Sequence, residues 1–163
     1  MASIKLSVDF NGLLEKIEAA GGNIENAARQ AASECAKAAH DELVSECNAS
    51  GVPASVSGEI EHGVKVTSGG NVYEVKAGWK MGDYNPKNPS AGFKAVFLNY
   101  GTARRSTKEE RVIHAFGGEF VTLGKDRGAI AARGFIARAK KSTSKKVKKI
   151  QKEALQKMLK ELT

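Results

Sequence analysis

The amino-acid sequence predicts an α+β fold in which a small antiparallel sheet of three to four strands packs with a long N-terminal helix and a long C-terminal helix. Residues 23–47 and 134–162 repeat apolar residues at three- and four-residue steps, as amphipathic helices do. Residues 60–102 contain alternating segments typical of strands. Strands and helices do not alternate along the chain, which disfavours a parallel βαβ arrangement. At 163 residues we expect a single domain, 1–163.

The N-terminal part of the chain predicts a strand and then a short helix. Apolar and polar residues alternate from Ser3 to Phe10, so this segment is a candidate fourth strand. Asp9 or Asn11 suits the N-cap of a short helix, which Gly21-Gly22 ends.

The helix predicted over 23–47 is rich in Ala, Glu, Gln and Lys, which form helices well. Its apolar stripe is mostly small: Ile24, Ala28, Ala31, Cys35, Ala39, Leu43 and Cys47. Small residues allow close approach but bury little area, so we expect this helix to depend on packing partners. Cys35 and Cys47 would lie about 18 Å apart along its axis, too far to pair, so we expect idle or buried thiols.

The sheet is predicted over residues 60–102, after a loop that contains Pro53. Residues 60–78 read as a hairpin with a turn at Ser68–Asn71, and Trp79 reads as a core or rim anchor. Residues 94–102, KAVFLNYGT, carry apolar groups on both faces of an alternating pattern and predict the central strand. Gly101 would end it, and we expect Gly101→Val to disrupt this exit and lower solubility.

Residues 103–133 mix charges, glycine pairs and a short alternating piece at Phe120–Leu123. A structureless loop of this length is unusual inside a compact domain. We therefore expect a long mobile loop, or one that a partner orders, with part of it pairing as an extra hairpin.

The net charge of +8 is unevenly distributed along the chain. Residues 1–100 hold 9 basic and 12 acidic residues, whereas residues 101–163 hold 17 basic and 6 acidic ones. The asymmetry predicts an anionic partner such as nucleic acid, or contact between the acidic part of one subunit and the basic part of the next. The alternative is a solvated helix face on which lysine stems cover apolar neighbours.

Catalytic and ligand-binding motifs are not evident. His40, His62 and His114 are scattered, and no nucleophile elbow, phosphate loop or metal-ligand spacing occurs. We expect no catalysis, no cofactor and no metal. No apolar run reaches the roughly 20 residues that span a bilayer, and the N-terminus lacks the apolar core of a secretory signal. We expect an intracellular protein without a membrane partner.

Two short motifs and their order resemble a known family. The motifs are Leu98-Asn99-Tyr100-Gly101-Thr102 and Gly134-Phe135-Ile136-Ala137-Arg138-Ala139, and the loop Gly51–Val66 precedes them. The chain resembles the small tail-completion and neck proteins of long-tailed bacteriophages, which include minor tail and head–tail joining proteins. Members typically show Glu/Asn-Tyr/Phe-Gly-Thr, a Pro…Thr-Gly-x-Leu segment before the hairpin, and a Pro-Phe-Leu-x-Pro-Ala start to the last helix. Gly134 and Arg138 replace the two prolines of that last pattern.

The resemblance implies a structural protein of a phage or prophage virion, located in the tail or neck after assembly in the host cytoplasm. Such a protein would act by self-association, for instance as a hexameric ring, and by docking to other neck or tail proteins, with passing contact to phage DNA. The residues expected to hold the fold are Phe97, Tyr100, Gly101, Thr102, Phe135 and Ile136. The expected subunit or DNA contacts are Arg104, Arg105, Arg111, Lys140, Lys141, Lys145, Lys148, Lys149 and Lys152. The alternative is a nucleic-acid-binding protein that uses the basic C-terminal helix.

Overall fold

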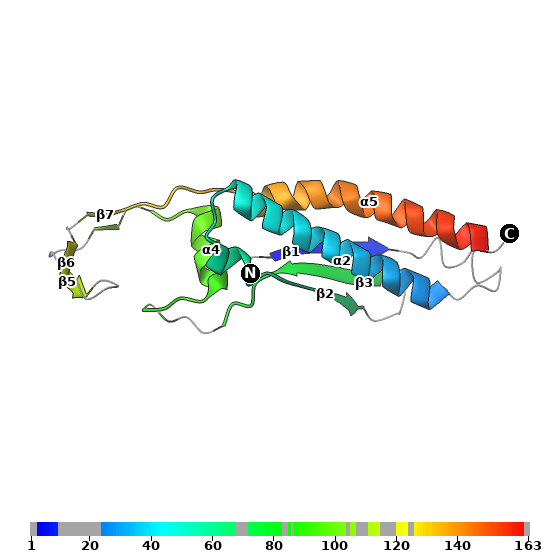
Figure 1. Cartoon of the computed structure of the whole chain (residues 1–163), viewed down its shortest axis with the longest axis horizontal. Helices are drawn as coiled ribbons and strands as arrows, with labels where there is room; N and C mark the ends of the chain where they lie inside the picture. The colour runs from blue at the N-terminus through cyan, green and yellow to red at the C-terminus, as the bar shows by residue number, and fades with distance from the viewer. Residues whose placement is uncertain are drawn as a thin grey trace.

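The computed structural model describes residues 3–9, 24–67, 72–82, 85, 87–103, 105–106, 111–114, 120–123 and 126–161. These residues form an elongated α+β protein in which two long helices lie on one face of a three-stranded antiparallel sheet (Figure 1). The predicted fold class is confirmed. The helix predicted between residues 11 and 22 lies outside the described residues.

The sheet consists of β1 (Ser3–Asp9), β2 (Glu61–Val66) and β3 (Val72–Gly78), in the order β1-β3-β2. Both outer strands run antiparallel to β3, and Leu6, Val75 and Val64 share one row across the sheet. The predicted N-terminal strand and the pairing of the two predicted hairpin strands are confirmed, whereas the turn predicted at Ser68–Asn71 lies outside the described residues. The centre of the sheet, however, is β3 and not residues 94–102.

Alternation along the strands separates a buried face from a polar one. Ile4, Val8, Tyr73 and Val75 are at most 2% exposed and face the helices. The residues between them, such as Lys5 and Lys76, point to the opposite face. One covered face and one polar face are usual for an antiparallel sheet.

The covering layer consists of α2 (Ile24–Ala49) and α5 (Phe135–Glu161), which run antiparallel. The predicted small-residue stripe of α2 is buried from Ala28 to Cys47, and Ala32 and Ala36 widen it. Cys35 and Cys47 are both buried and free. No helix in the described part of the chain combines the length and apolar character needed to cross a membrane.

Short α3 (Ala54–Ser57) follows α2 within the loop predicted around Pro53. The indole Nε1 of Trp79 donates a hydrogen bond of 2.6 Å to the carbonyl oxygen of Val56 in α3. Trp79 also packs edge-on against Phe135, with ring centroids 6.1 Å apart. Trp79 is therefore a core anchor that joins the sheet, α3 and α5.

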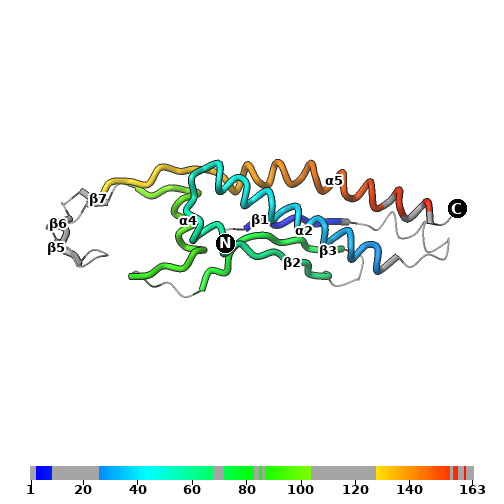
Figure 2. The backbone as a smooth tube through the Cα atoms, viewed as in Figure 1, coloured from blue at the N-terminus to red at the C-terminus, as the bar shows by residue number. Residues whose placement is uncertain are grey.

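The strand predicted over 94–102 is wrong, because residues Ala91–Tyr100 form the helix α4. The predicted sheet region 60–102 therefore ends at Gly78. Gly92, Ala95 and Asn99, at three- and four-residue steps, are buried on one side of α4. A short run that is apolar on both sides fits a buried helix as well as a central strand, and here tertiary packing selects the helix. Figure 2 shows α4 standing across the axes of α2 and α5 at the end where α5 begins.

Four short strands lie within the segment predicted as a long loop, 103–133. β4 (Arg105–Ser106) pairs with β7 (Asp126–Gly128), and β5 (Arg111–His114) pairs with β6 (Phe120–Leu123). The expectation that part of this segment pairs as an extra hairpin is confirmed by β5 and β6. These strands lie beyond α4, at the end of the molecule opposite the C-terminus (Figure 1).

Candidate interaction surfaces

The two motif segments, far apart in the sequence, form one hydrogen-bonded joint between α4 and α5. The backbone N–H groups of Arg133 and Gly134 donate to the carbonyl oxygens of Leu98 (3.1 Å) and Asn99 (3.0 Å). The last turn of α4 thus supplies the acceptors for the residues that open α5.

Asn99 caps α5 from outside that helix. Its side chain is buried, with the residue 4% exposed, and its Oδ1 accepts a hydrogen bond of 2.9 Å from the backbone N–H of Ile136. The first N–H groups of any helix lack intrahelical partners, and a side-chain oxygen normally comes from the preceding residues to satisfy one. Gly134 precedes α5 at φ +61°, a conformation that glycine adopts readily and proline cannot.

Gly101 ends α4 rather than a strand. Two features of its backbone require glycine at this position. Its φ is +76°, and a Cβ would lie 2.6 Å from the carbonyl oxygen of Ile130. Next to it, the N–H of Thr102 donates to that same oxygen (2.9 Å), and Thr102 Oγ1 accepts from the N–H of Ile130 (3.1 Å). Gly101→Val is therefore still expected to disrupt this exit, at a helix end.

The residues predicted to hold the fold differ in how deeply they are buried. Phe135 is fully buried and Ile136 is 8% exposed, so both lie in the core. Phe97 is half-buried. Tyr100 is 65% exposed and takes no part in the core, contrary to expectation, because it lies on the outer side of the last turn of α4.

The end of α2 is fixed to the start of α5 by two arginines. The Nη1 of Arg133 donates to the carbonyl oxygens of Ser50 (2.9 Å) and Gly51 (2.6 Å). The Nε of Arg138 donates to Glu46 Oε2 (2.8 Å), and its Nη2 donates to Ser50 Oγ (2.6 Å). Both guanidinium groups thus lie at the negative end of the α2 dipole, where cations are favoured.

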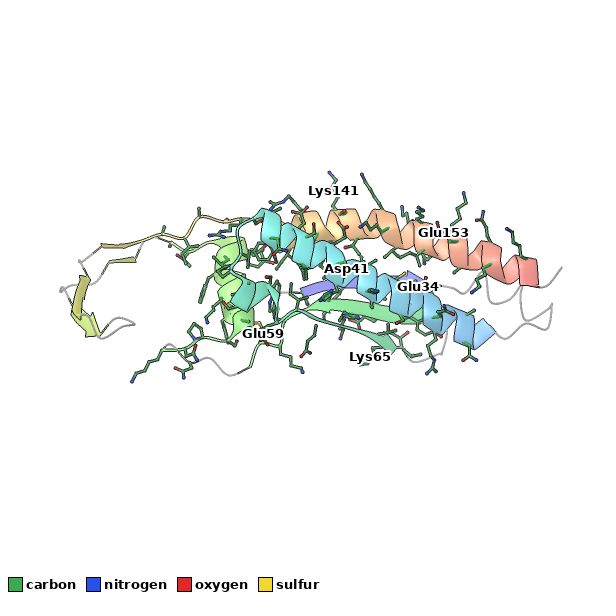
Figure 3. The ribbon with its side chains drawn as sticks, in the orientation of Figure 1. Glu34, Asp41, Glu59, Lys65, Lys141 and Glu153 are labelled. Atoms are coloured by element: carbon green, nitrogen blue, oxygen red, sulfur yellow. The ribbon has the colours of Figure 1, made fainter. Side chains whose placement is uncertain are left out.

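The predicted lysine contacts of α5 all lie on its exposed side: Lys140, Lys141, Lys145, Lys148, Lys149 and Lys152. Figure 3 places Lys141 on the side of α5 turned away from α2, whereas Asp41 and Glu34 lie along α2. Within the described structure, Lys149 is the one of these six with an ion pair, 3.7 Å from Glu153. We call these six residues the lysine face.

Lys146, by contrast, reaches toward α2 and pairs with Glu42 of that helix. The Glu42 side chain is 14% exposed, and hydrogen bonds from Lys146 and Ser142 lower the pKa of its carboxyl group. The basic residues of α5 therefore serve two roles, one that holds α2 and one that faces outward.

Of the three arginines predicted to make contacts, the structure describes the backbone of two. Arg105 belongs to β4 and Arg111 to β5, but only their backbone is described. Arg104 lies outside the described residues.

A second surface lies on the polar face of the sheet, where a hollow of about 330 Å³ lies beside Gly63 and Gly78. Lys5, Lys65, Lys76 and Lys80 line it together with Glu61. Lys80 pairs with Glu61 at 2.9 Å, and Lys5 and Lys76 approach Glu74. The acidic groups thus neutralise part of the positive charge around this hollow.

Asn99, Arg133 and Arg138 carry the joint but are absent from the residues predicted to hold the fold. The sequence contains a pattern that could have indicated Asn99. Gly92, Ala95 and Asn99 are spaced like residues on one side of a helix that begins after Ser90 and ends before Gly101. The two arginines gave no local signal, because their partners lie more than 80 positions away.

In the part of the chain that the structure describes, no three His, Cys, Asp or Glu side chains gather as a metal-ligand set. Comparison with protein-family models, with curated proteins and with solved structures gives no match.

Proposed function

We propose that this protein is a structural component of a long-tailed phage or prophage virion, which completes the tail or joins it to the head by self-association and docking. The observation that carries the proposal is the joint between α4 and α5. The two motifs on which the resemblance rests, 98–102 and 134–139, meet at this one joint. Motifs that act together in one structural feature support a family resemblance better than separate matches do.

Two further features support a role in assembly. The exposed lysine face of α5 and the exposed carboxylates of Glu34 and Asp41 on α2 offer unlike surfaces on one subunit, and closed rings require unlike surfaces to meet. The strands β4 to β7 lie beyond α4, away from the three-stranded sheet, which suits contact with a neighbour (Figure 1).

Solution mass by light scattering, across protein concentration and at low and high salt, tests self-association. We expect an oligomer, for instance a hexamer, that dissociates as salt screens the charged contacts. Reversal of Lys141, Lys145, Lys148 and Lys152 to glutamate should lower the mass. Reversal of the exposed Lys65 and Lys87, which lie outside both α2 and α5, is the control. A mass unaffected by salt and by both sets of reversals would count against charged subunit contacts.

Nucleic-acid binding is the second candidate function, and the lysine face is the observation that favours it. Lys141, Lys145, Lys148 and Lys152 follow one line over about 16 Å of the α5 axis. Each lysine that neutralises a phosphate contributes about 0.9 to the slope of log affinity against log salt. A duplex titration should therefore give a slope shallower by roughly 3 to 4 after all four become glutamine. If the unmodified protein and the four-glutamine variant gave equal salt slopes, the lysine face would be excluded as the DNA contact.

A further inference from the structure

The fold brings together two of the three histidines, which lie far apart in the sequence. His40 belongs to α2 and His62 to β2, and their ring centroids lie 5.0 Å apart with an interplanar angle of 53°. The His40 side chain is 29% exposed, and His62 is exposed as well. Both rings are therefore accessible from solvent at the edge of the sheet.

A carboxylate orients one of these rings. His40 Nδ1 lies 3.0 Å from Oδ1 of Asp41. An ionised carboxylate accepts hydrogen bonds but cannot donate them, so Nδ1 carries the proton and the lone pair of a neutral ring lies on Nε2. A carboxylate on the far nitrogen is the usual partner of a metal-binding histidine, because it selects the tautomer and raises the basicity of the ligand.

We propose that His40 and His62 form a two-imidazole site for a divalent transition metal such as Zn²⁺, with water completing the coordination and Asp41 orienting His40. Metal–nitrogen bonds of about 2.0–2.1 Å in a tetrahedral site place the centroids of two imidazole rings roughly 5 Å apart. The observed separation of 5.0 Å agrees with this geometry. A bound ion would tie the edge strand β2 to α2.

The two cysteines do not compete for the ion. Burial raises the pKa of Cys35 to about 11 and that of Cys47 to about 12, with smaller contributions from neighbouring glutamates. Since the thiolate is the metal ligand, both thiols stay protonated and inert near neutral pH. The site does not depend on the proposed virion role, because each subunit holds both histidines.

Calorimetric titration of the full chain with ZnCl₂ in a buffer without chelators tests the site. We expect His40→Gln and His62→Gln each to weaken binding by at least about 10-fold, and the double variant to weaken it further, because it retains no imidazole ligand. Asp41→Asn should weaken it by about 10- to 100-fold, as removal of an orienting partner usually does. His114→Gln is the matched control and should bind as the unmodified protein does.

Thermal melting gives a second readout that does not rely on heats of binding. Zn²⁺ should raise the Tm of the unmodified protein and of His114→Gln, but not that of His62→Gln, whose fold is checked by its Tm without metal. His62→Cys should recover binding, because a thiolate can replace imidazole on zinc. Binding by His62→Gln at unchanged affinity, or loss of binding in His114→Gln, would overturn the proposal.

Discussion

The helices α2 and α5 have nearly equal lengths, 26 and 27 residues, yet they contribute to the protein in opposite ways. α2 contains five acidic and two basic residues, whereas α5 contains ten basic and two acidic ones. α2 buries a broad stripe of mostly alanine and cysteine, and it contacts all three strands of the sheet as well as α3 and α5. α5 contacts mainly α2 and β1.

The difference in composition between α2 and α5 indicates the kind of packing that each helix suits. Alanine and cysteine allow α2 to lie close to several neighbours at once, at the cost of little buried area per residue. α5 instead begins with two large buried side chains, Phe135 and Ile136, and becomes only partly buried by Ile150 and Ala154. α2 is therefore specialised for internal packing, whereas α5 is buried along its inner side from Phe135 to Val147 and leaves its lysine face exposed.

The largest expected effect comes from the anchor of α5. Phe135→Ala removes a fully buried ring that packs on Trp79, so the free energy of unfolding should fall by about 3–5 kcal/mol in a urea titration. Tyr100→Ala is the control, since its side chain is mostly exposed and its loss should stay within about 0.5 kcal/mol. Similar losses for Phe135→Ala and Tyr100→Ala would contradict the assignment of Phe135, but not Tyr100, to the core.

Overpacking tests the close approach of α2. Ala32 is fully buried, whereas the adjacent Ser33 is exposed on the same helix. Ala32→Leu should reduce the free energy of unfolding by about 1–3 kcal/mol, because the extra methylene groups have no space. Ser33→Leu, which places the same side chain one position along, should leave it within about 0.5 kcal/mol, measured in the same way. If Ala32→Leu proved neutral, the packing around α2 would be looser than the structure indicates.

The contact between Glu42 and Lys146 tests the connection between the two helices. The pKa of Glu42 is lowered in the folded protein from its usual 4.5, chiefly by the hydrogen bond from Lys146. A lowered pKa contributes stability above pH 4.5 that is lost as the pH falls through the folded-state value. Glu42→Gln should therefore cost about 1 kcal/mol at pH 7, and the difference should shrink below pH 4.5.

Glu153→Gln provides the matched control for this pH dependence. Glu153 forms an exposed pair with Lys149 within α5, so its replacement should have little effect at any pH. Chemical denaturation of both variants between pH 3 and 7 is the measurement. A constant difference for Glu42→Gln across this range would refute its role between the helices.

The smallest expected effect is a gain in stability on the lysine face. Lys145 lies four residues from both Lys141 and Lys149, and like charges at this spacing destabilise a helix. Lys145→Glu should raise the free energy of unfolding by about 0.2–0.5 kcal/mol per pair at low salt, and screening should remove the gain at high salt. Lys145→Gln should give a smaller gain, and a loss in both variants would indicate that Lys145 makes a stabilising contact.

Local pattern was enough to predict most of the regular structure. Both long helices, the hairpin and the N-terminal strand follow from spacing, because each keeps one face toward the core. α4 was predicted as a strand because KAVFLNY is apolar on every side, and such a run has no distinct period.

The candidate sites are harder to predict from the sequence, because contacts between distant segments create them. The lysine face could be predicted, since a solvent-facing stripe depends only on helical spacing. The contact of Asn99 with Ile136 and the approach of His40 to His62 depend instead on how distant segments pack. Only the three-dimensional arrangement distinguishes these residues from ordinary polar ones.

The hydrogen bonds between Thr102 and Ile130 bear on how the protein tolerates changes in chain length. Thr102 and Ile130 lie side by side, so the segment between them begins and ends at one point. The entropy of closing such an insertion rises only slowly with its length, by about 0.6 kcal/mol for each doubling. A change in the length of the segment between Thr102 and Ile130 should therefore leave the sheet, α2 and α5 in their positions.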